Sequence, residues 1–261
     1  MIKTAQEIEL LKRGGVFLSD ILREIRDACV AGSSTEALDA IARKRMQAVG
    51  GRPSFLGYKI SEDVPPYPGA LCVSINDEVV HGLPIPNRTV QSGDIVGLDI
   101  GMWFEGLATD MATTVIVGEV EPRTAQLVAD TRRSLEIGLS VIKPGGLVSD
   151  IGAAIEDFLK PKGYGIVKDL VGHGVGHAVH EDPQIPNYRE PRAPRVPLRE
   201  GMVLAIEPMV TLGTWRVHVK PDAWTIVTDD HRPCAHFEVT IAVTRDGYQL
   251  ITPWPDTFRE T

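Results

Sequence analysis

Two segments of the chain share one arrangement of a glycine, a short apolar run and an acid. Gly93 precedes Asp99 by six positions, and Gly201 precedes Glu207 by the same interval. A carboxylate inside an apolar strand costs free energy unless a partner neutralises it. Two acids at equivalent points favour a shared partner, and a divalent cation is the natural one. The sequence therefore predicts related halves that meet at a metal site.

The order of helices and strands repeats in the same way. Apolar residues recur at helical spacing over 4–30 and 33–49, and strand-like segments follow at 70–75, 94–100 and 112–117. Helical patterns return over 124–142 and 149–160, followed by strand-like segments at 202–207, 224–228, 237–244 and 248–252. This order predicts an α+β fold with two pseudo-symmetric halves, about 1–118 and 119–261. No Ser- or Pro-rich linker separates the halves, so we expect a single domain over 1–261.

Helix starts and loops are marked by particular residues. Thr4-x-x-Glu7 and Ser33-x-x-Glu36 have the pattern of capping boxes. The segment 59–69 carries three prolines and two acids, and 182–197 carries five prolines. We expect both to be surface loops, since the charges of the second argue against a buried strand.

Composition excludes several classes of protein. The 261 residues contain 27 Lys and Arg against 35 Asp and Glu, a net charge of −8, which argues against a nucleic-acid binder. The three cysteines form no CxxC pair, so a reducing compartment is expected. The sequence shows neither the apolar core of a signal peptide nor a run near the ~20 apolar residues of a membrane span. These features predict a cytoplasmic protein that does not associate with membranes.

Asp99 and Asp110 flank a predicted hairpin whose turn is expected within 101–106. Antiparallel pairing would bring the two carboxylates close together, where they would repel unless a metal lay between them. The alternative is one turn-capping Asp and one exposed Asp, and this pair alone does not decide between them.

Residues 172–183 hold three histidines, His173, His177 and His180, in a glycine-rich run. Three glycines in five positions argue against a helix and so against a zincin-type His pair. A metal-binding His with a second His behind it is favoured over a phosphate cradle, because no Lys-Ser or Lys-Thr follows.

Nucleophilic alternatives are weaker. There is no Gly-x-Ser-x-Gly motif, and a Cys72–His81 pair lacks an orienting third group.

Two further acids, Glu207 and Glu238, lie in apolar strand patterns. With the residues above they complete a candidate set of four carboxylates and one imidazole: Asp99, Asp110, His173, Glu207 and Glu238. Four negative charges match two divalent cations, with Mn, Fe, Co or Zn favoured over Cu(I). Two such ions can hold a bridging hydroxide and polarise a carbonyl, which is hydrolytic chemistry.

Over nearly its whole length the sequence resembles the type I methionine aminopeptidases, which have the pita-bread fold, an antiparallel sheet covered by helices. The resemblance is carried by five motifs: Asn76-Asp77-Glu78-Val79-Val80-His81-Gly82, Gly97-Leu98-Asp99-Ile100-Gly101, Gly172-His173-Gly174-Val175-Gly176 with His180-Glu181-Asp182-Pro183, Ala205-Ile206-Glu207-Pro208, and Phe237-Glu238-x-Thr240. The resemblance implies a metal-dependent aminopeptidase that removes the initiator methionine from nascent chains when the second residue is small.

The resemblance also assigns roles to residues. It makes the five candidate residues metal ligands, with Asp110 and Glu238 bridging. It places His81 at the scissile amide nitrogen and His180 at the carbonyl oxygen, and Glu207 suits a proton acceptor. It assigns the methionine pocket to Tyr67, Cys72, Trp224, Phe55 and Tyr58.

This sequence departs from the family pattern at several positions. Lys59 to Pro66 resembles an insertion beside the pocket, and Val179 replaces the usual Phe, which predicts a wider pocket. Thr109 and Val239 also differ from the pattern next to two of the ligands without removing either one.

Two other functions remain open at this point. A Xaa-Pro peptidase of the same fold would require an additional N-terminal domain. A binding module with a decayed site would not need the intact set of ligands and histidines. For the leading function we expect a monomer that acts on N-terminal Met peptides and nascent chains, with transient ribosome contact.

Overall fold

The structure, a computed structural model of the chain, describes residues 2–192 and 194–254. Within these residues the helices are α1 (Ala5–Ala28), α2 (Thr35–Ala48), α3 (Pro122–Ser140), α4 (Val148–Leu159) and the 3₁₀ turn η1 (Lys160–Lys162). The strands are β1 (Arg52–Pro53), β2 (Leu71–Ile75), β3 (Glu78–Val80), β4 (Ile95–Phe104), β5 (Leu107–Ile116), β6 (Gly165–Ile166), β7 (Gly172–Gly174), β8 (Glu181–Ile185), β9 (Val203–Ile206), β10 (Met209–Thr211), β11 (Val217–Val219), β12 (Ile226–Thr228), β13 (Cys234–His236), β14 (Glu238–Thr244) and β15 (Gly247–Leu250). The predicted order of two helices followed by strands, repeated once, is confirmed.

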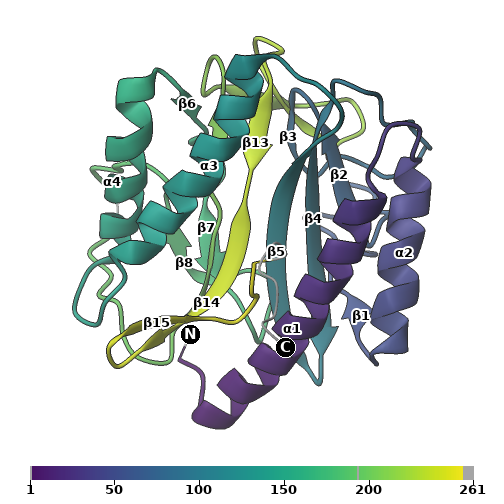
Figure 1. Cartoon of the computed structure of the whole chain (residues 1–261). Coiled ribbons are helices and arrows are strands. Elements are labelled where there is room, and N and C mark those ends of the chain that lie inside the picture. The colour runs from purple at the N-terminus through teal and green to yellow at the C-terminus, as the bar shows by residue number, and fades with distance from the viewer. Residues whose placement is uncertain (1, 193, 255–261) are drawn as a thin grey trace.

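The long strands form one antiparallel sheet. Its order is β1-β4-β5-β14-β9-β7-β8, with β2 also paired to β4 and β15 to β14. Two small sheets, β13-β10-β6 and β11-β12-β3, lie beside it. In Figure 1, α1 crosses in front of β4 and β5, and α3 crosses in front of the strands of the second half. The helices thus cover one face of the sheet.

Side chains alternate along β4 and β5 between the sheet face covered by helices and the opposite face. Leu98, Ile100 and Met111 belong to the apolar core that includes Leu18 and Leu22 of α1. A second core packs α3 and α4 against the strands of the other half. Because neighbouring strand residues point to opposite faces, the acids Asp99 and Asp110 point away from the helices.

Helix α1 begins as predicted. The Thr4 hydroxyl accepts a hydrogen bond from the Glu7 amide at 3.2 Å, and the Glu7 carboxylate accepts one from the Thr4 amide at 2.7 Å. Helix α2 differs slightly, because Ser34 caps it and not Ser33. A Cβ at Gly15 would lie 2.1 Å from the carbonyl oxygen of Ile251, so this glycine permits close packing inside a helix.

The turn predicted over 101–106 is shorter than expected, so the prediction of its extent was wrong. Strands β4 and β5 continue to Phe104 and from Leu107, and Gly101 pairs with Asp110 inside the ladder. The turn is only Glu105-Gly106, both with positive φ (48° and 84°), as a tight two-residue hairpin requires. The buried side chains of Met102 and Phe104 extend the strand past the predicted end.

The expected loop over 182–197 was also partly wrong. Residues Glu181–Ile185 form β8, which pairs with β7 at the edge of the sheet. An edge position accommodates Pro183 and an exposed Asp182, while Ile185 is fully buried. The segment 59–69 contains no helix or strand, as predicted. Among the described residues, no helix combines the length and apolar character needed to cross a bilayer.

Candidate metal centre

Five adjacent strands of the main sheet supply the predicted ligand side chains. Asp99 lies on β4, Asp110 on β5, Glu238 at the start of β14, Glu207 just after β9 and His173 on β7. In sheet order these strands are consecutive. Residues far apart in sequence are therefore brought together by strand pairing alone.

The pairing register places these side chains on one face. Ala112 of β5 pairs with Asp99 on one side and with Glu238 on the other. Asp110 is two positions from Ala112, so it shares that face. Ala205 pairs with His173, and Glu207 is two positions beyond Ala205. Paired residues lie on the same side of a sheet, so all five side chains converge opposite the helices.

Burial and mutual repulsion perturb the four carboxylates. Burial, with the charge of Glu207 adding to it, raises the pKa of Asp99 to about 7. Burial raises the pKa of Glu207 to about 7 as well, against an opposing effect of His173. Burial and the neighbouring acids hold the pKa values of Asp110 and Glu238 well above their usual range. The cluster resists carrying its full negative charge unless a cation is present.

Buried carboxylate oxygens without hydrogen-bond partners also indicate that the acid cluster requires a cation. Oδ1 of Asp99 and Oε1 of Glu238 are buried, and neither has a hydrogen-bond partner in the described chain. Ligand atoms of Asp110, His173 and Glu238 lie within 4.8 Å of one another. Buried acids of this kind are satisfied by metal coordination, so the donor set fits a divalent cation.

His173 is oriented by its own backbone surroundings. Its Nδ1 lies 2.9 Å from the carbonyl oxygen of Gly174, and a carbonyl can only accept, so Nδ1 carries the hydrogen. Nε2 is then free to bind a metal and lies 3.5 Å from Oε1 of Glu207. Burial also lowers the pKa of His173, which favours the neutral form that coordinates. The glycine-rich run around it is a strand and not a helix, as expected.

The two other predicted histidines border the same cavity. The Nδ1 atom of His180 lies 2.9 Å from the Tyr58 hydroxyl, and its ring centroid is 4.4 Å from that of His173. Burial and the nearby His236 lower the pKa of His81 to about 4. Burial, with His81 nearby, also lowers the pKa of His180. Both imidazoles are therefore neutral at pH 7.

An apolar cavity of about 320 Å³ opens above the acids. Tyr67, Cys72 and Trp224 form a buried cluster with Phe55 and Tyr58 packed against it. The ring centroids of Tyr67 and Trp224 are 5.2 Å apart. All five residues predicted for the methionine pocket line this cavity, together with the acids and both histidines. Val179, in contrast, is buried and is not among the lining residues.

The sequence reading missed His236. This side chain is 3% exposed, its Nε2 lies 3.4 Å from Oε2 of Glu207, and it groups with Glu207 and Glu238 as potential ligands. Its position two residues before Glu238 in an apolar run was an available signal. Ile60, Leu170 and Met209 also line the cavity and were not predicted.

A sheet face with a crowded acid cluster, a neutral imidazole with a nitrogen free to bind a metal and an adjoining apolar pocket is the arrangement expected of a metal-dependent hydrolase. Comparison with known proteins supports this assignment to the metal-dependent hydrolases. A model of metallopeptidase family M24 matches residues 9–245. The methionine aminopeptidase 1 of Bacillus subtilis is 41% identical over 251 residues, covering 96% of this chain and 98% of the relative. The methionine aminopeptidase of Clostridium acetobutylicum is 38% identical, covering 97% and 98%.

Solved structures extend the comparison to the fold. The methionine aminopeptidase of Thermotoga maritima is 44% identical, covers 97% of this chain and 98% of its own, and superposes with a TM-score of 0.91. The chain belongs to metallopeptidase family M24, within its methionine aminopeptidases. The prolidase of Pyrococcus furiosus, at 22% identity and a TM-score of 0.73, shares the fold. The predicted pita-bread architecture and metallo-aminopeptidase class are thus confirmed.

Proposed function

We propose that this chain removes N-terminal methionine from peptides and nascent proteins whose second residue is small. The observation that carries the proposal is the convergence of four acids and one histidine, the five proposed ligands, from neighbouring strands beneath a pocket of aromatic and sulfur side chains. Such a pocket suits the apolar, polarisable side chain of methionine.

The proposed ligands of two divalent cations (Co, Mn, Fe or Zn) are Asp99, Asp110, His173, Glu207 and Glu238. The family resemblance implies that Asp110 and Glu238 would be shared between the two cations. Glu238 has ligand atoms near those of Asp110 and His173 and also near those of Glu207 and His236. When bound, the cations supply a nucleophilic water at neutral pH and polarise the scissile carbonyl.

The protein's own groups handle the protons. Glu207, with a pKa raised to about 7, is suited to accept a proton near neutral pH. The Tyr58 hydroxyl can donate to Nδ1 of His180, which leaves the hydrogen on Nε2. His180 can then donate a hydrogen bond to the carbonyl oxygen as negative charge develops there. The proton that Glu207 accepts can pass to the departing amide nitrogen. His81, neutral at pH 7, can help by taking up that proton at one ring nitrogen as it releases the hydrogen of the other.

The test is a comparison of substrates and metals. We expect cleavage of Met-Ala-Ser with added Mn or Co and little cleavage of Ala-Pro peptides. Preferential cleavage of Ala-Pro would favour a Xaa-Pro peptidase, which the shared fold of the prolidases keeps as the second candidate. An empty metal site at saturating Mn, with cleavage of neither peptide, would indicate a binding module.

We also propose one catalytic domain over 1–261, with halves of about 1–118 and 119–261. Its support is the main sheet, which runs through both halves without interruption. We propose a monomer that works in the cytoplasm on chains emerging from the ribosome. Three buried free thiols, Cys29, Cys72 and Cys234, suit a reducing compartment. Light scattering tests whether the protein is a monomer, and co-sedimentation with ribosomes tests the ribosome contact.

A further inference from the structure

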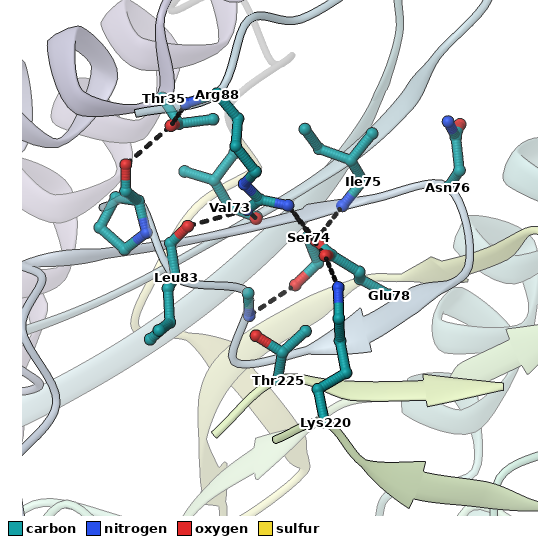
Figure 2. Close-up of polar contacts among 12 residues, drawn as sticks. Thr35, Val73, Ser74, Ile75, Asn76, Glu78, Leu83, Arg88, Lys220 and Thr225 are labelled. Carbon is teal, nitrogen blue, oxygen red and sulfur yellow. Dashed lines mark hydrogen bonds and ion pairs between the residues drawn. The ribbon is translucent and has the colours of Figure 1, made fainter. Parts of the chain in front are cut away.

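A buried acid next to the pocket is surrounded by two cations. The carboxylate of Glu78, 5% exposed, accepts hydrogen bonds from Nη1 of Arg88 at 2.8 and 2.7 Å and from Nζ of Lys220 at 3.0 Å. It also accepts a hydrogen bond from the Ile75 amide at 2.9 Å. Figure 2 shows Arg88 and Lys220 approaching Glu78 from opposite sides.

Arg88 also reaches two backbone segments at once. Its Nη2 donates to the carbonyl oxygen of Val73 at 2.6 Å and to that of Leu83 at 2.8 Å (Figure 2). Val73 lies on β2, and Leu83 is two residues past His81. The planar guanidinium holds all these acceptors in one fixed arrangement. Its own amide donates to Thr35 of α2 at 3.0 Å, which fixes the arginine backbone.

The backbone at His81 needs such support. His81 has φ of +57°, a left-handed conformation that costs free energy for a residue with a side chain. The next residue is held tightly, because the Gly82 amide donates to the Ser74 hydroxyl at 3.1 Å and its carbonyl accepts from the Val73 amide at 2.8 Å. A Cβ at Gly82 would lie 2.2 Å from the carbonyl oxygen of Val73, so this approach requires glycine.

Within the described chain no hydrogen bond to the His81 imidazole is formed, and its ring meets Trp224 at a centroid distance of 6.2 Å. The direction of this imidazole therefore depends on its backbone. That backbone is fixed before His81 by pairing of Val80 with Ile226, and after it by the contacts of Gly82 and Leu83.

We propose that Arg88, itself held by Glu78, is a positioning residue that maintains the left-handed backbone of His81 and so aims the imidazole into the cavity. The inference rests on the proposed function, because it gives His81 the role near the leaving nitrogen. Arg88 does not line the cavity, and none of its hydrogen bonds in the described chain reaches a proposed metal ligand.

Lys220 offers a matched control. It binds the same carboxylate as Arg88, with a similarly half-exposed side chain, but its ammonium makes no contact with the carbonyls of Val73 or Leu83. Lys220→Met removes a positive charge beside Glu78 and leaves in place the Arg88 clamp, by which we mean the hydrogen bonds of Arg88 to the carbonyls of Val73 and Leu83. Arg88→Ala removes both.

The experiment measures kcat and KM for Met-Ala-Ser with saturating Mn in Arg88→Ala, Arg88→Lys and Lys220→Met. We expect Arg88→Ala to lower kcat by about 10²-fold, the scale of a misplaced reacting group, with KM and Mn affinity by calorimetry nearly unchanged. Arg88→Lys keeps the charge, but its single nitrogen cannot occupy both the Nη1 position on Glu78 and the Nη2 position on the two carbonyls. Because it keeps the charge beside Glu78, Arg88→Lys should fold even if Arg88→Ala does not. The kcat of Arg88→Lys should still fall at least tenfold. Lys220→Met should stay within about threefold of the parent.

A double variant separates positioning from general destabilisation. In a His81→Ala background, Arg88→Ala or Arg88→Lys should change kcat by less than about threefold, since residues that act through one another are non-additive. A recurrence of the full decrease in that background would overturn the inference, as would parental kcat in folded Arg88→Lys. If the parent itself fails to cleave Met-Ala-Ser, the proposed function fails instead. In that case the His81 imidazole signal in NMR still tests positioning, because it should broaden or shift in Arg88→Lys and stay unchanged in Lys220→Met.

Discussion

Replacing Asp99 by Asn should stabilise the metal-free protein at pH 8. Burial raises the pKa of Asp99 from 3.8 to about 7. A difference of about 3 pKa units corresponds to roughly 4 kcal/mol of differential stabilisation of the neutral form. An Asn amide carries no charge, but burying its unsatisfied hydrogens costs about 1–3 kcal/mol. We therefore expect a net gain of about 1–3 kcal/mol in the free energy of unfolding.

The sign depends on pH and on metal. An acid whose pKa is higher in the folded state destabilises the fold as pH rises, beginning near its unfolded pKa of about 4 and completed above about 7. The advantage of Asp99→Asn should thus be full at pH 8. At pH 4 little of the electrostatic gain remains, so the cost of burying the amide should leave the variant somewhat less stable than the parent. With saturating Mn the order should reverse, because the variant loses a ligand and with it part of the stabilisation by binding.

Urea denaturation in EDTA at pH 8 and pH 4, and again at pH 8 with Mn, measures all three conditions. Glu62→Gln is a suitable control, because the Glu62 side chain is 94% exposed and should change stability by less than about 0.5 kcal/mol. If Asp99→Asn in EDTA at pH 8 is no more stable than the parent, the acids are not under electrostatic strain and the reasoning fails.

Further substitutions test other parts of the site. His81→Ala should lower kcat by roughly 10²–10⁴-fold in peptide assays while Mn binding in calorimetry is unchanged; unchanged turnover would remove His81 from the mechanism. Tyr58→Phe removes the hydroxyl 2.9 Å from His180 and should lower kcat about tenfold, with little change in KM. Trp224→Ala opens the pocket and should raise KM for Met peptides by about 10–100-fold, with a smaller effect on Ala peptides. Gly174→Ala places a Cβ 2.3 Å from the carbonyl oxygen of Asp182 and should lower the Tm in calorimetry by several degrees, about 2–4 °C per kcal/mol lost; an unchanged Tm would show that β8 moves freely.

Local signals in the sequence predicted local structure well. The capping box at Thr4 and the apolar spacing of α1 involve only residues that lie close together in the sequence. The sequence therefore suffices to predict where this helix begins and which face is buried. The acids in apolar runs were also informative, because burial of a charge is unusual enough to indicate a partner. That reasoning gathered Asp99, Asp110, Glu207 and Glu238, which the structure places in one cavity. Their roles as ligands remain a prediction.

Errors arose where tertiary context outweighed local preference. Gly101 and the residues after it suggested a wide turn, yet burial of Met102 beneath α1 and α2 extends the strand to Phe104. The charges and prolines of 182–197 suggested a loop, yet β7 provides a partner that converts Glu181–Ile185 into an edge strand.

The Arg88 clamp belongs to a third kind of feature, one that no spacing rule could have revealed. Its acid lies 10 residues from Arg88 and 142 from Lys220, and two of its acceptors are backbone carbonyls, which leave no trace in residue identity. The resemblance motif contained Glu78 and His81 three residues apart without indicating that one supports the other. Catalytic groups can be recognised by their chemistry, whereas the groups that aim them are defined only by geometry. A left-handed histidine whose imidazole has no hydrogen-bond partner in the described chain is the kind of strained residue that points to such support.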